Sequence, residues 1–250
     1  SQKGQEALIL EKSRGVGGRL ATRRIDNQGL DHGALFLDFI KNKLLVGGMS
    51  SYAKSMTTNL NILKEHKVEK ISKSSSGWRI GTERGPEFTC LNLILTAPAP
   101  QAIELLKDSA LYPPSHSVSN VSYSKALILL MIAREIPLPL QSMELDDYSI
   151  YFMRERNLHP NGIVIHLPPG PSEIYFEEPD KVIISHFKTL LAKSALSQLE
   201  IEKYELKKWR YARPLTTYPT PFLEILPKLY LCGDAFGNPV DSAQALARAV

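Results

Sequence analysis

Short apolar runs and stretches of helical period alternate along the first half of the chain. The apolar runs at residues 7–11 and 88–96 are bounded by turn residues, which predicts buried strands, the first of them parallel. Residues 48–65 place apolar side chains at near-helical spacing behind a serine pair, which predicts a helix. Two alternating runs on either side of a serine-rich turn predict strands at residues 67–72 and 77–82. The run after Pro100 predicts a helix at residues 101–106.

The pattern changes between about residues 115 and 209, where proline-rich joints separate alternating runs from one helical run. The predicted elements are strands of an antiparallel sheet at residues 122–132, 149–153, 162–167 and 201–211 and a helix at residues 181–198. An apolar run and an alanine-rich helical run close the chain over residues 228–250. The order predicts an α/β chain interrupted by a segment of antiparallel character.

Composition narrows the class of protein. Of 250 residues, 43% are apolar and 22% are charged, which is ordinary for a soluble globular chain. The formal charge of +4 is small and its charged residues are scattered, so nucleic acid is not an expected partner. The sequence contains no run of about 18 apolar residues, so no membrane span is expected. Cys90 and Cys232 each lie in an apolar run without metal-ligand spacing, which indicates buried thiols in a reducing, cytoplasmic setting.

The segment that follows the first apolar run carries candidate binding chemistry. Glu11 ends that run, and a carboxylate at this end of a strand accepts hydrogen bonds from ribose hydroxyls. Gly17 and Gly18 let backbone N–H groups approach phosphate oxygens, and Arg19 supplies a planar, permanent charge that forks onto phosphate. These residues predict a site for a dinucleotide. On composition alone, a strand end, a flexible turn and a solvated basic tail explain them equally well.

A second candidate cluster lies near the end of the chain. Asp234 leaves the last apolar run, where it is suited to accept a hydrogen bond from a sugar hydroxyl. Asp241 or Ser242 is expected to cap the helix that follows. Taken alone, these residues also describe an ordinary strand–turn–helix.

Several segments in this order resemble the flavin amine oxidase superfamily. Residues 11–19, Glu-Lys-Ser-Arg-Gly-Val-Gly-Gly-Arg, look like the second half of its FAD-binding signature. Residues 15–24 followed by Asp31-His-Gly-Ala34 resemble the renalase-like, FAD-dependent oxidoreductases of bacteria. The segment Lys208-Trp-Arg-Tyr-Ala-Arg-Pro214 resembles a late strand of those proteins, and Leu229-Tyr-Leu-Cys-Gly-Asp-Ala-Phe-Gly237 resembles their C-terminal flavin-binding motif.

The resemblance implies an α/β fold in which a Rossmann-like, glutathione-reductase-like FAD-binding domain carries an inserted antiparallel α+β substrate domain. It implies an FAD-binding domain over residues 1–112 and 215–250 and a substrate domain over residues 113–214. Val68 would lay its backbone along the adenine, and the helix at 241 would aim its N-terminus at the flavin pyrimidine edge. The cofactor-binding residues it implies are Glu11, Lys12, Gly17, Gly18, Arg19, Val68, Thr96, Gly233, Asp234, Ser242 and Ala243.

Three departures from the family pattern stand out. The chain has no Gly-x-Gly-x-x-Gly turn, which should open such a domain, so we expect a strand, turn and helix to be missing before Ser1. Resembling proteins are longer between the Asp-x-Gly-Ala segment and Gly47, which predicts a seam near residues 38–46. Asn238-Pro239 occupies a stretch that is often richer in glycine.

The expected activity is that of an FAD-dependent oxidoreductase. It would take a hydride from a small amine or a dihydronicotinamide-type substrate, NAD(P)H or an isomer of it, and pass electrons to oxygen. Tyr123, Trp209 and Tyr211, with Phe236, are candidates for an aromatic wall on the substrate side, although aromatic residues in strands are usually core. Three histidines, His116, His166 and His186, are candidate polar groups, but each is expected to be a surface or structural residue. No catalytic residue or metal site is identified. The alternative is a cofactor-free, non-catalytic protein with a dinucleotide fold.

Overall fold

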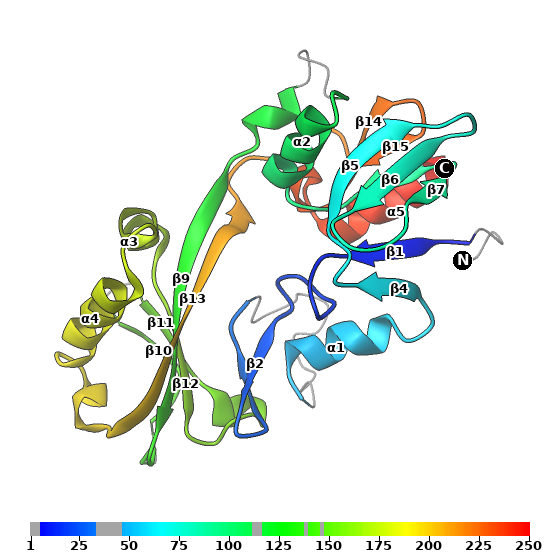
Figure 1. Cartoon of the computed structure of the whole chain (residues 1–250). Coiled ribbons are helices and arrows are strands. Elements are labelled where there is room, and N and C mark those ends of the chain that lie inside the picture. The colour runs from blue at the N-terminus through cyan, green and yellow to red at the C-terminus, as the bar shows by residue number, and fades with distance from the viewer. Residues whose placement is uncertain (1–5, 34–46, 112–116, 138–139, 146–147) are drawn as a thin grey trace. The chain divides into compact units, whose positions relative to one another are not determined.

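The computed structural model divides the chain into two compact units, each described here by itself (Figure 1). The structure describes residues 6–33, 47–111, 117–137, 140–145 and 148–250. Unit 1 comprises residues 1–14, 60–123 and 213–250, and unit 2 comprises residues 15–59 and 124–212. The predicted seam at 38–46, the candidate His116 and the segment before residue 6 lie outside the described residues. Within the described part of the chain, no helix has the length and apolar character needed to cross a membrane.

Unit 1 is built from short strands and two helices around one apolar core. Its strands are β1 (Leu8–Glu11), β4 (Asn61–Lys64), β5 (Val68–Lys73), β6 (Trp78–Thr82), β7 (Phe88–Cys90), β8 (Leu93–Leu95), β14 (Leu223–Leu226) and β15 (Leu229–Leu231). Its helices are α2 (Ala99–Asp108), α5 (Pro239–Ala249) and the 3₁₀ turns η2 (Ser117–Asn120) and η5 (Asp234–Phe236).

Three small sheets divide the strands of unit 1. β1 pairs with β4 in parallel, β15 pairs with β8 in parallel and with β14 antiparallel, and β5, β6 and β7 form an antiparallel meander. Helix α2 packs on the meander, where the Ile71 N–H donates to Ser109 Oγ at 2.9 Å. The core joins Trp78 and Ile80 of the meander to Leu106 of α2 and Leu231 of β15.

Unit 2 is a five-stranded sheet with a helical face and a hairpin face. The sheet order is β10-β11-β12-β9-β13, and the neighbours from β10 to β9 are antiparallel. Its strands are β9 (Tyr123–Ala133), β10 (Met143–Leu145), β11 (Tyr148–Phe152), β12 (Gly162–His166) and β13 (Ile201–Pro214), with β2 (Thr22–Ile25) and β3 (Gln28–Asp31) forming the hairpin. The first residue of β9 and the last two residues of β13 are counted in unit 1. Its helices are α1 (Met49–Met56), α3 (Pro169–Tyr175), α4 (Asp180–Leu191), η3 (Met153–Arg156) and η4 (Ala195–Gln198).

Alternation along these strands builds a separate core on each face of the sheet. Leu127, Leu129 and Ile165 pack with Phe187 of α4, and Figure 1 shows α3 and α4 together on that face. Ile128, Leu130 and Val164, which point the other way, pack with Leu30 of the hairpin. The hairpin turns at Asp26-Asn27, both with positive φ, which is the geometry of a two-residue type I′ turn.

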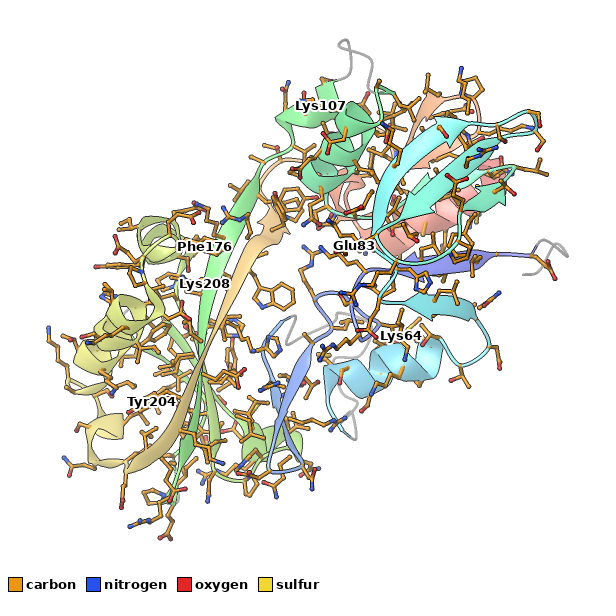
Figure 2. All side chains as sticks on the ribbon, in the orientation of Figure 1. Lys64, Glu83, Lys107, Phe176, Tyr204 and Lys208 are labelled. Atoms are coloured by element: carbon orange, nitrogen blue, oxygen red, sulfur yellow. The ribbon has the colours of Figure 1, made fainter. Side chains whose placement is uncertain are left out.

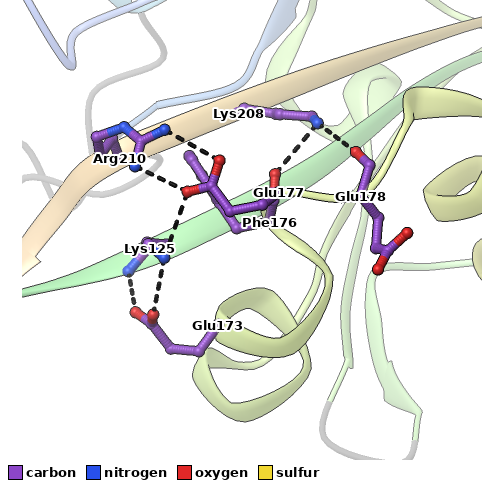
Figure 3. Close-up of polar contacts among 7 residues, drawn as sticks. All are labelled: Lys125, Glu173, Phe176, Glu177, Glu178, Lys208 and Arg210. Atoms are coloured by element: carbon purple, nitrogen blue, oxygen red, sulfur yellow. Dashed lines mark hydrogen bonds and ion pairs between the residues drawn. The ribbon is translucent and has the colours of Figure 1, made fainter.

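Phe176, just after α3, anchors the helical face to the sheet (Figures 2 and 3). Its buried ring lies 5.1 Å from Lys125 Nζ and 4.9 Å from the Arg210 guanidinium. Both cations also pair with Glu177, and Lys208 Nζ donates to the carbonyl oxygens of Phe176 and Glu178. One aromatic ring thus packs against cations from two strands of the sheet.

Most predicted elements of the middle segment are confirmed, but two predicted helices are too long. The structure ends α1 at Met56, and residues 61–64 of the predicted helix 48–65 form β4 instead. The Thr57 hydroxyl donates to the Lys54 carbonyl, a bond that competes with continued helix, and Ile62 then pairs with Ile9 of β1. The helix predicted over 181–198 ends at Leu191, and Ser194 caps the separate turn η4.

The predicted strands 7–11 and 88–96 are also corrected. β1 is parallel as predicted but not buried, because Leu8 and Ile9 remain about two-fifths exposed at 41% and 40%. The run 88–96 forms two strands in different sheets: β7 pairs with β6, and β8 pairs with β15. A continuous apolar run gives no sign of this change of partner strand. Cys90 is half-buried rather than buried, whereas Cys232 is buried, and both thiols are free.

Candidate functional site

In unit 1, the carboxyl ends of β8 and β15 bring together two predicted cofactor-binding residues. The Cys232 N–H donates to the Leu95 carbonyl at 3.1 Å, so Thr96 and Gly233 leave the paired strands side by side. Gly233 has φ +120, and a Cβ built on it would lie 3.6 Å from the Thr96 carbonyl oxygen. This left-handed conformation favours glycine and turns the chain sharply after the strand.

Asp234 follows this turn and is held by a tyrosine. The Tyr123 hydroxyl donates to Asp234 Oδ1 at 2.8 Å and accepts the N–H of Ala99 at 3.3 Å. The tyrosine therefore connects the start of α2 to the aspartate at the end of β15. Tyr123, predicted on the substrate side, is placed beside a predicted cofactor-binding carboxylate.

Helix α5 begins behind the same turn. Asn238 is its N-cap, since Asn238 Oδ1 accepts the Val240 N–H at 2.9 Å, so the prediction that Asp241 or Ser242 caps this helix is wrong. The asparagine side chain reaches the first available N–H because Pro239 has none. Ser242, buried in the first turn, instead accepts the Gly233 N–H at 2.9 Å. Ala243 is the next residue of the same turn and is exposed.

Glu11 lies at the end of β1 in unit 1, next to the chain that leads from β4 into β5. Its carboxylate accepts the Ser13 N–H at 2.7 Å, and its carbonyl accepts the His66 N–H at 2.9 Å. The second bond holds the segment before Val68 against the end of β1. Glu11 and Val68 therefore belong to one local structure, with the exposed Lys12 directly after the carboxylate.

Gly17, Gly18 and Arg19 lie in unit 2. Gly17 has φ +115, and a Cβ on it would come within 2.6 Å of the Ala53 Cβ in α1, so only glycine fits this close approach. Arg19 Nη1 donates to the Tyr211 and Ala212 carbonyl oxygens at 3.4 and 2.9 Å. The structure thus brings Arg19 to the end of β13, beside a predicted substrate-side residue.

A buried carboxylate that sequence reasoning missed lies at the end of β3. Asp31 is fully buried and accepts hydrogen bonds from the Thr22 hydroxyl at 2.5 Å and the Met49 N–H at 3.0 Å. Arg156 of η3 pairs with its other oxygen at 3.2 Å. Asp31 therefore connects the hairpin, the start of α1 and η3. The signal available in the sequence was its place in the Asp-His-Gly-Ala segment.

Next to Asp31, His32 contacts Trp209, another predicted substrate-side residue. The two rings stack with centroids 5.7 Å apart, and the indole N–H donates to the His32 carbonyl at 2.9 Å. Burial, with a smaller contribution from Lys207, lowers the pKa of His32 to about 4. Burial likewise lowers the pKa of His166 to about 4, with His32 as the next cause. Both imidazoles are therefore uncharged at pH 7.

A comparison with models of protein families shows to which family the chain belongs. Residues 35–243 match the model of the family "Flavin containing amine oxidoreductase". The chain belongs to this family. A flavin cofactor and an oxidoreductase activity are therefore the properties of its family, as the motifs at both ends of the chain led us to expect. No curated protein matches the sequence at a significant level.

Solved structures agree with this amine oxidoreductase fold. A candidate protoporphyrinogen oxidase from Exiguobacterium sp. 255-15 matches with a TM-score of 0.60 and 20% identity over 82% of this chain and 50% of its own. A fatty acid isomerase from P. acnes, described as producing CLA, matches at 0.55 and 13%, over 81% of this chain and 52% of its own. An oxidoreductase from Methanosarcina mazei matches at 0.52 and 11%, over 80% of this chain and 53% of its own. The identities are low, so these likenesses show the fold alone, and the chain spans about half the length of these structures.

The predicted cofactor residues of the chain fall into local groups. Within unit 1, Thr96, Gly233 and Ser242 gather around the turn before Asp234, while Glu11 and Val68 share a second local structure. Arg19 and its glycines belong to unit 2. That all of them bind one nucleotide stays a prediction. The compact units also assign residues 15–59 differently from the predicted domain boundaries, which stay a prediction as well.

Proposed function

We propose that this chain is the FAD-dependent, renalase-like part of an oxidoreductase that takes a hydride from a small substrate. The observation that carries the proposal is the arrangement around Asp234: a carboxylate behind a positive-φ glycine, at the carboxyl ends of two parallel strands, held by Tyr123. Ligands of open α/β sheets bind at this end of the strands. The chain belongs to a family of flavin-containing proteins, which favours a flavin as the ligand. The Asp234 carboxylate at this end of the strands favours a nucleotide with sugar hydroxyls.

The residues of unit 1 fit a flavin nucleotide. Two carboxylates, Glu11 and Asp234, each stand at the end of a parallel strand, where they accept hydrogen bonds from ribose and ribityl hydroxyls. Gly233 keeps the backbone beside Thr96 open to a ligand, because no side chain rises from the turn. When bound, the flavin supplies the electron sink for hydride transfer. The protein's part is to bind and orient the substrate and to keep water away.

The division of labour follows the predicted domains. Residues 1–112 and 215–250 would bind FAD, with Arg19 as counter-charge to the pyrophosphate, in a glutathione-reductase-like arrangement. Residues 113–214 would form the inserted substrate domain, and Tyr211 and Trp209 would line its substrate side. The substrate is an amine or a dihydronicotinamide, NAD(P)H or an isomer, and oxygen reoxidises the flavin.

Titration of the purified chain with FAD tests the proposal. We expect flavin fluorescence to be quenched on binding. Asp234→Ala should weaken the affinity at least tenfold, since a carboxylate that accepts hydrogen bonds from sugar hydroxyls is lost. Asp108→Ala, an exposed carboxylate at the end of α2, is the matched control and should leave affinity unchanged. Anaerobic addition of amines and dihydronicotinamide isomers should then bleach the flavin absorbance with one class. A protein that takes up no FAD would overturn the proposal.

A further inference from the structure

The turn that leads into β12 in unit 2 contains a pair of residues with chemistry of its own. Asn161 is the one asparagine of the sequence that is followed directly by a glycine, Gly162. Asparagine is a chemically labile residue, because the backbone nitrogen of the next residue can attack its side-chain carbonyl carbon. A following glycine obstructs that attack least, since it carries no side chain and restricts the backbone least.

The pair closes a four-residue turn from His159 to Gly162. The Gly162 N–H donates to the His159 carbonyl at 3.0 Å, which is the bond that defines a β-turn. Pro160 occupies the second position, and Asn161 occupies the third with a negative φ, so the turn is of type I. Proline at the second position and glycine at the fourth are the residues that this turn type prefers.

The fold requires the glycine of this pair. A Cβ built on Gly162 would come within 2.8 Å of the His159 Cβ and 3.3 Å of the Met153 Cβ. Gly162 is also the first residue of β12, where it pairs with Ile132 of β9. Close packing at the start of a central strand therefore places a glycine directly after Asn161, and the labile pair is a consequence of the fold.

In the closed turn, native contacts hold the reacting atoms apart. Asn161 Nδ2 donates to the Arg134 carbonyl at 2.9 Å, and the Asn161 N–H donates to His159 Nδ1 at 3.2 Å. The Asn161 carbonyl accepts the Ala133 N–H at 3.0 Å. The third residue of a type I turn has a ψ of about 0°. Ring closure requires rotation about ψ until the Gly162 nitrogen eclipses the Asn161 Cβ, so the turn must open first.

We propose that Asn161 is a site of spontaneous deamidation and that opening of the turn at residues 159–162 gates the reaction. In the open turn, the Gly162 nitrogen forms a bond to the Asn161 side-chain carbon. The amide nitrogen leaves as ammonia and takes up the proton that the Gly162 nitrogen loses, which leaves a five-membered succinimide. Water then opens either carbonyl of this ring and yields aspartate or isoaspartate. The reaction needs only water, so the inference is independent of the proposed function.

The products do not fit the closed turn. An aspartate has no N–H to donate to the Arg134 carbonyl, so it places a carboxylate beside a carbonyl oxygen that had accepted from Asn161. An isoaspartate adds a methylene to the backbone directly before β12, which shifts the bond from Gly162 to His159. Local opening is reversible until the ring forms, and afterwards the end of β12 cannot pack as before.

Peptide mapping by mass spectrometry tests the inference on the purified chain, kept at mildly alkaline pH either folded or unfolded in urea. Trypsin cleaves after Arg156 and Lys181 and releases residues 157–181 as one peptide. This peptide also contains Asn157, which precedes a leucine and is therefore an internal control. We expect Asn161 to deamidate at least tenfold faster in urea than in the folded chain, while Asn157 stays unchanged over the same period.

Two variants of His159 probe the gate. His159→Ala removes the acceptor of the Asn161 N–H and should raise the rate in the folded chain severalfold, whereas His159→Asn keeps an acceptor and should retain most of the protection. Where the alanine variant fails to fold, the comparison of folded and unfolded wild type decides. Equal rates in these two states would overturn the gating. No reaction at Asn161 in urea, or a reaction at Asn157 that is equally fast, would overturn the site itself.

Discussion

The Tyr123 hydroxyl donates to Asp234 Oδ1 at 2.8 Å, although the two residues are 111 positions apart in the sequence. Tyr123 opens β9 and Asp234 follows β15, so the bond joins the second and third segments of unit 1. Because the same hydroxyl accepts the Ala99 N–H, it also fixes the start of α2. A single phenol thus orients the carboxylate on which the proposed flavin site depends.

Tyr123→Phe removes this hydroxyl and keeps the ring. We expect unfolding free energy to fall by about 1–2 kcal/mol, since the Ala99 N–H loses its acceptor and Asp234 loses a donor. FAD affinity should fall three- to tenfold, because Asp234 is no longer oriented. Urea denaturation followed by circular dichroism and FAD titration measure the two effects. Tyr218→Phe, in which another unit 1 tyrosine that packs against Phe236 is changed, is the control for loss of a hydroxyl alone. Equal effects of both variants would contradict the role given to Tyr123.

Asp31→Ala should destabilise unit 2 strongly. The substitution leaves Arg156, whose side chain is 21% exposed, without its ion-pair partner and leaves the Thr22 and Met49 donors without their acceptor. Breaking such a buried pair costs about 3 kcal/mol or more. Asp26→Ala removes an exposed pair with Lys203 and should cost less than about 1 kcal/mol. Urea midpoints of the two variants decide the matter; comparable losses would show that burial of Asp31 is not what matters.

Phe176 should contribute more to stability than the charges around it. Phe176→Ala removes a buried ring that two cations contact and is expected to cost about 3–5 kcal/mol. Glu177→Gln breaks the pairs to Arg210 and Lys125, but its side chain is 66% exposed, so the expected loss is below about 1 kcal/mol. Thermal or urea unfolding compares them. High salt should reduce the effect of Glu177→Gln and leave that of Phe176→Ala nearly unchanged.

The two buried imidazoles predict a loss of stability in mild acid. Their pKa is about 4 in the folded protein and ordinary, about 6.5, in the unfolded chain, so the unfolded state binds more protons between these values. Stability should therefore fall as pH decreases from about 6.5 towards 4. Lys207 reinforces the low pKa of His32, whereas Asp31 and Glu205 oppose it.

His32→Gln isolates this contribution, because glutamine does not titrate. Carboxylates with a lowered pKa, such as Glu205, also lose stabilisation as pH falls, so only the difference between variant and wild type is informative. We expect the urea midpoint of the variant to decline less between pH 7 and pH 4.5 than that of the wild type. Parallel declines would contradict burial of an uncharged His32.

Local pattern predicted much of the fold, and its failures share a physical cause. The alternation at 67–72 and 77–82 predicted β5 and β6 correctly, because a hairpin is decided by neighbouring residues. The run 88–96 looked like one strand because period cannot reveal that β7 pairs with β6 while β8 pairs with β15. The helix 48–65 was extended too far because pairing of Ile62 with Ile9 depends on a distant partner.

The candidate site shows the same limit. The motif around Asp234 predicted a turn after the last apolar run, and the structure has one there. It did not reveal Tyr123, which comes from a strand more than a hundred residues earlier. Asp31 and His32 were visible only as letters of a motif. Their partners, Arg156 and Trp209, come from other parts of unit 2, so the spacing of residues in the sequence could not predict these contacts.

Arg19 has an observed structural role at the end of β13 and a proposed role in binding the FAD pyrophosphate, and two measurements can tell these roles apart. Its Nη1 donates to the carbonyl oxygens of Tyr211 and Ala212, which is a structural role, whereas a guanidinium can also fork onto phosphate oxygens. Arg19→Lys keeps the charge but loses the planar fork, and Arg19→Ala loses both. If Arg19 holds the pyrophosphate, FAD affinity should fall in the order wild type, lysine, alanine, with at least tenfold lost in the last step. If it serves only the end of β13, both variants should lower the urea midpoint and leave FAD affinity unchanged, which would remove Arg19 from the proposed site.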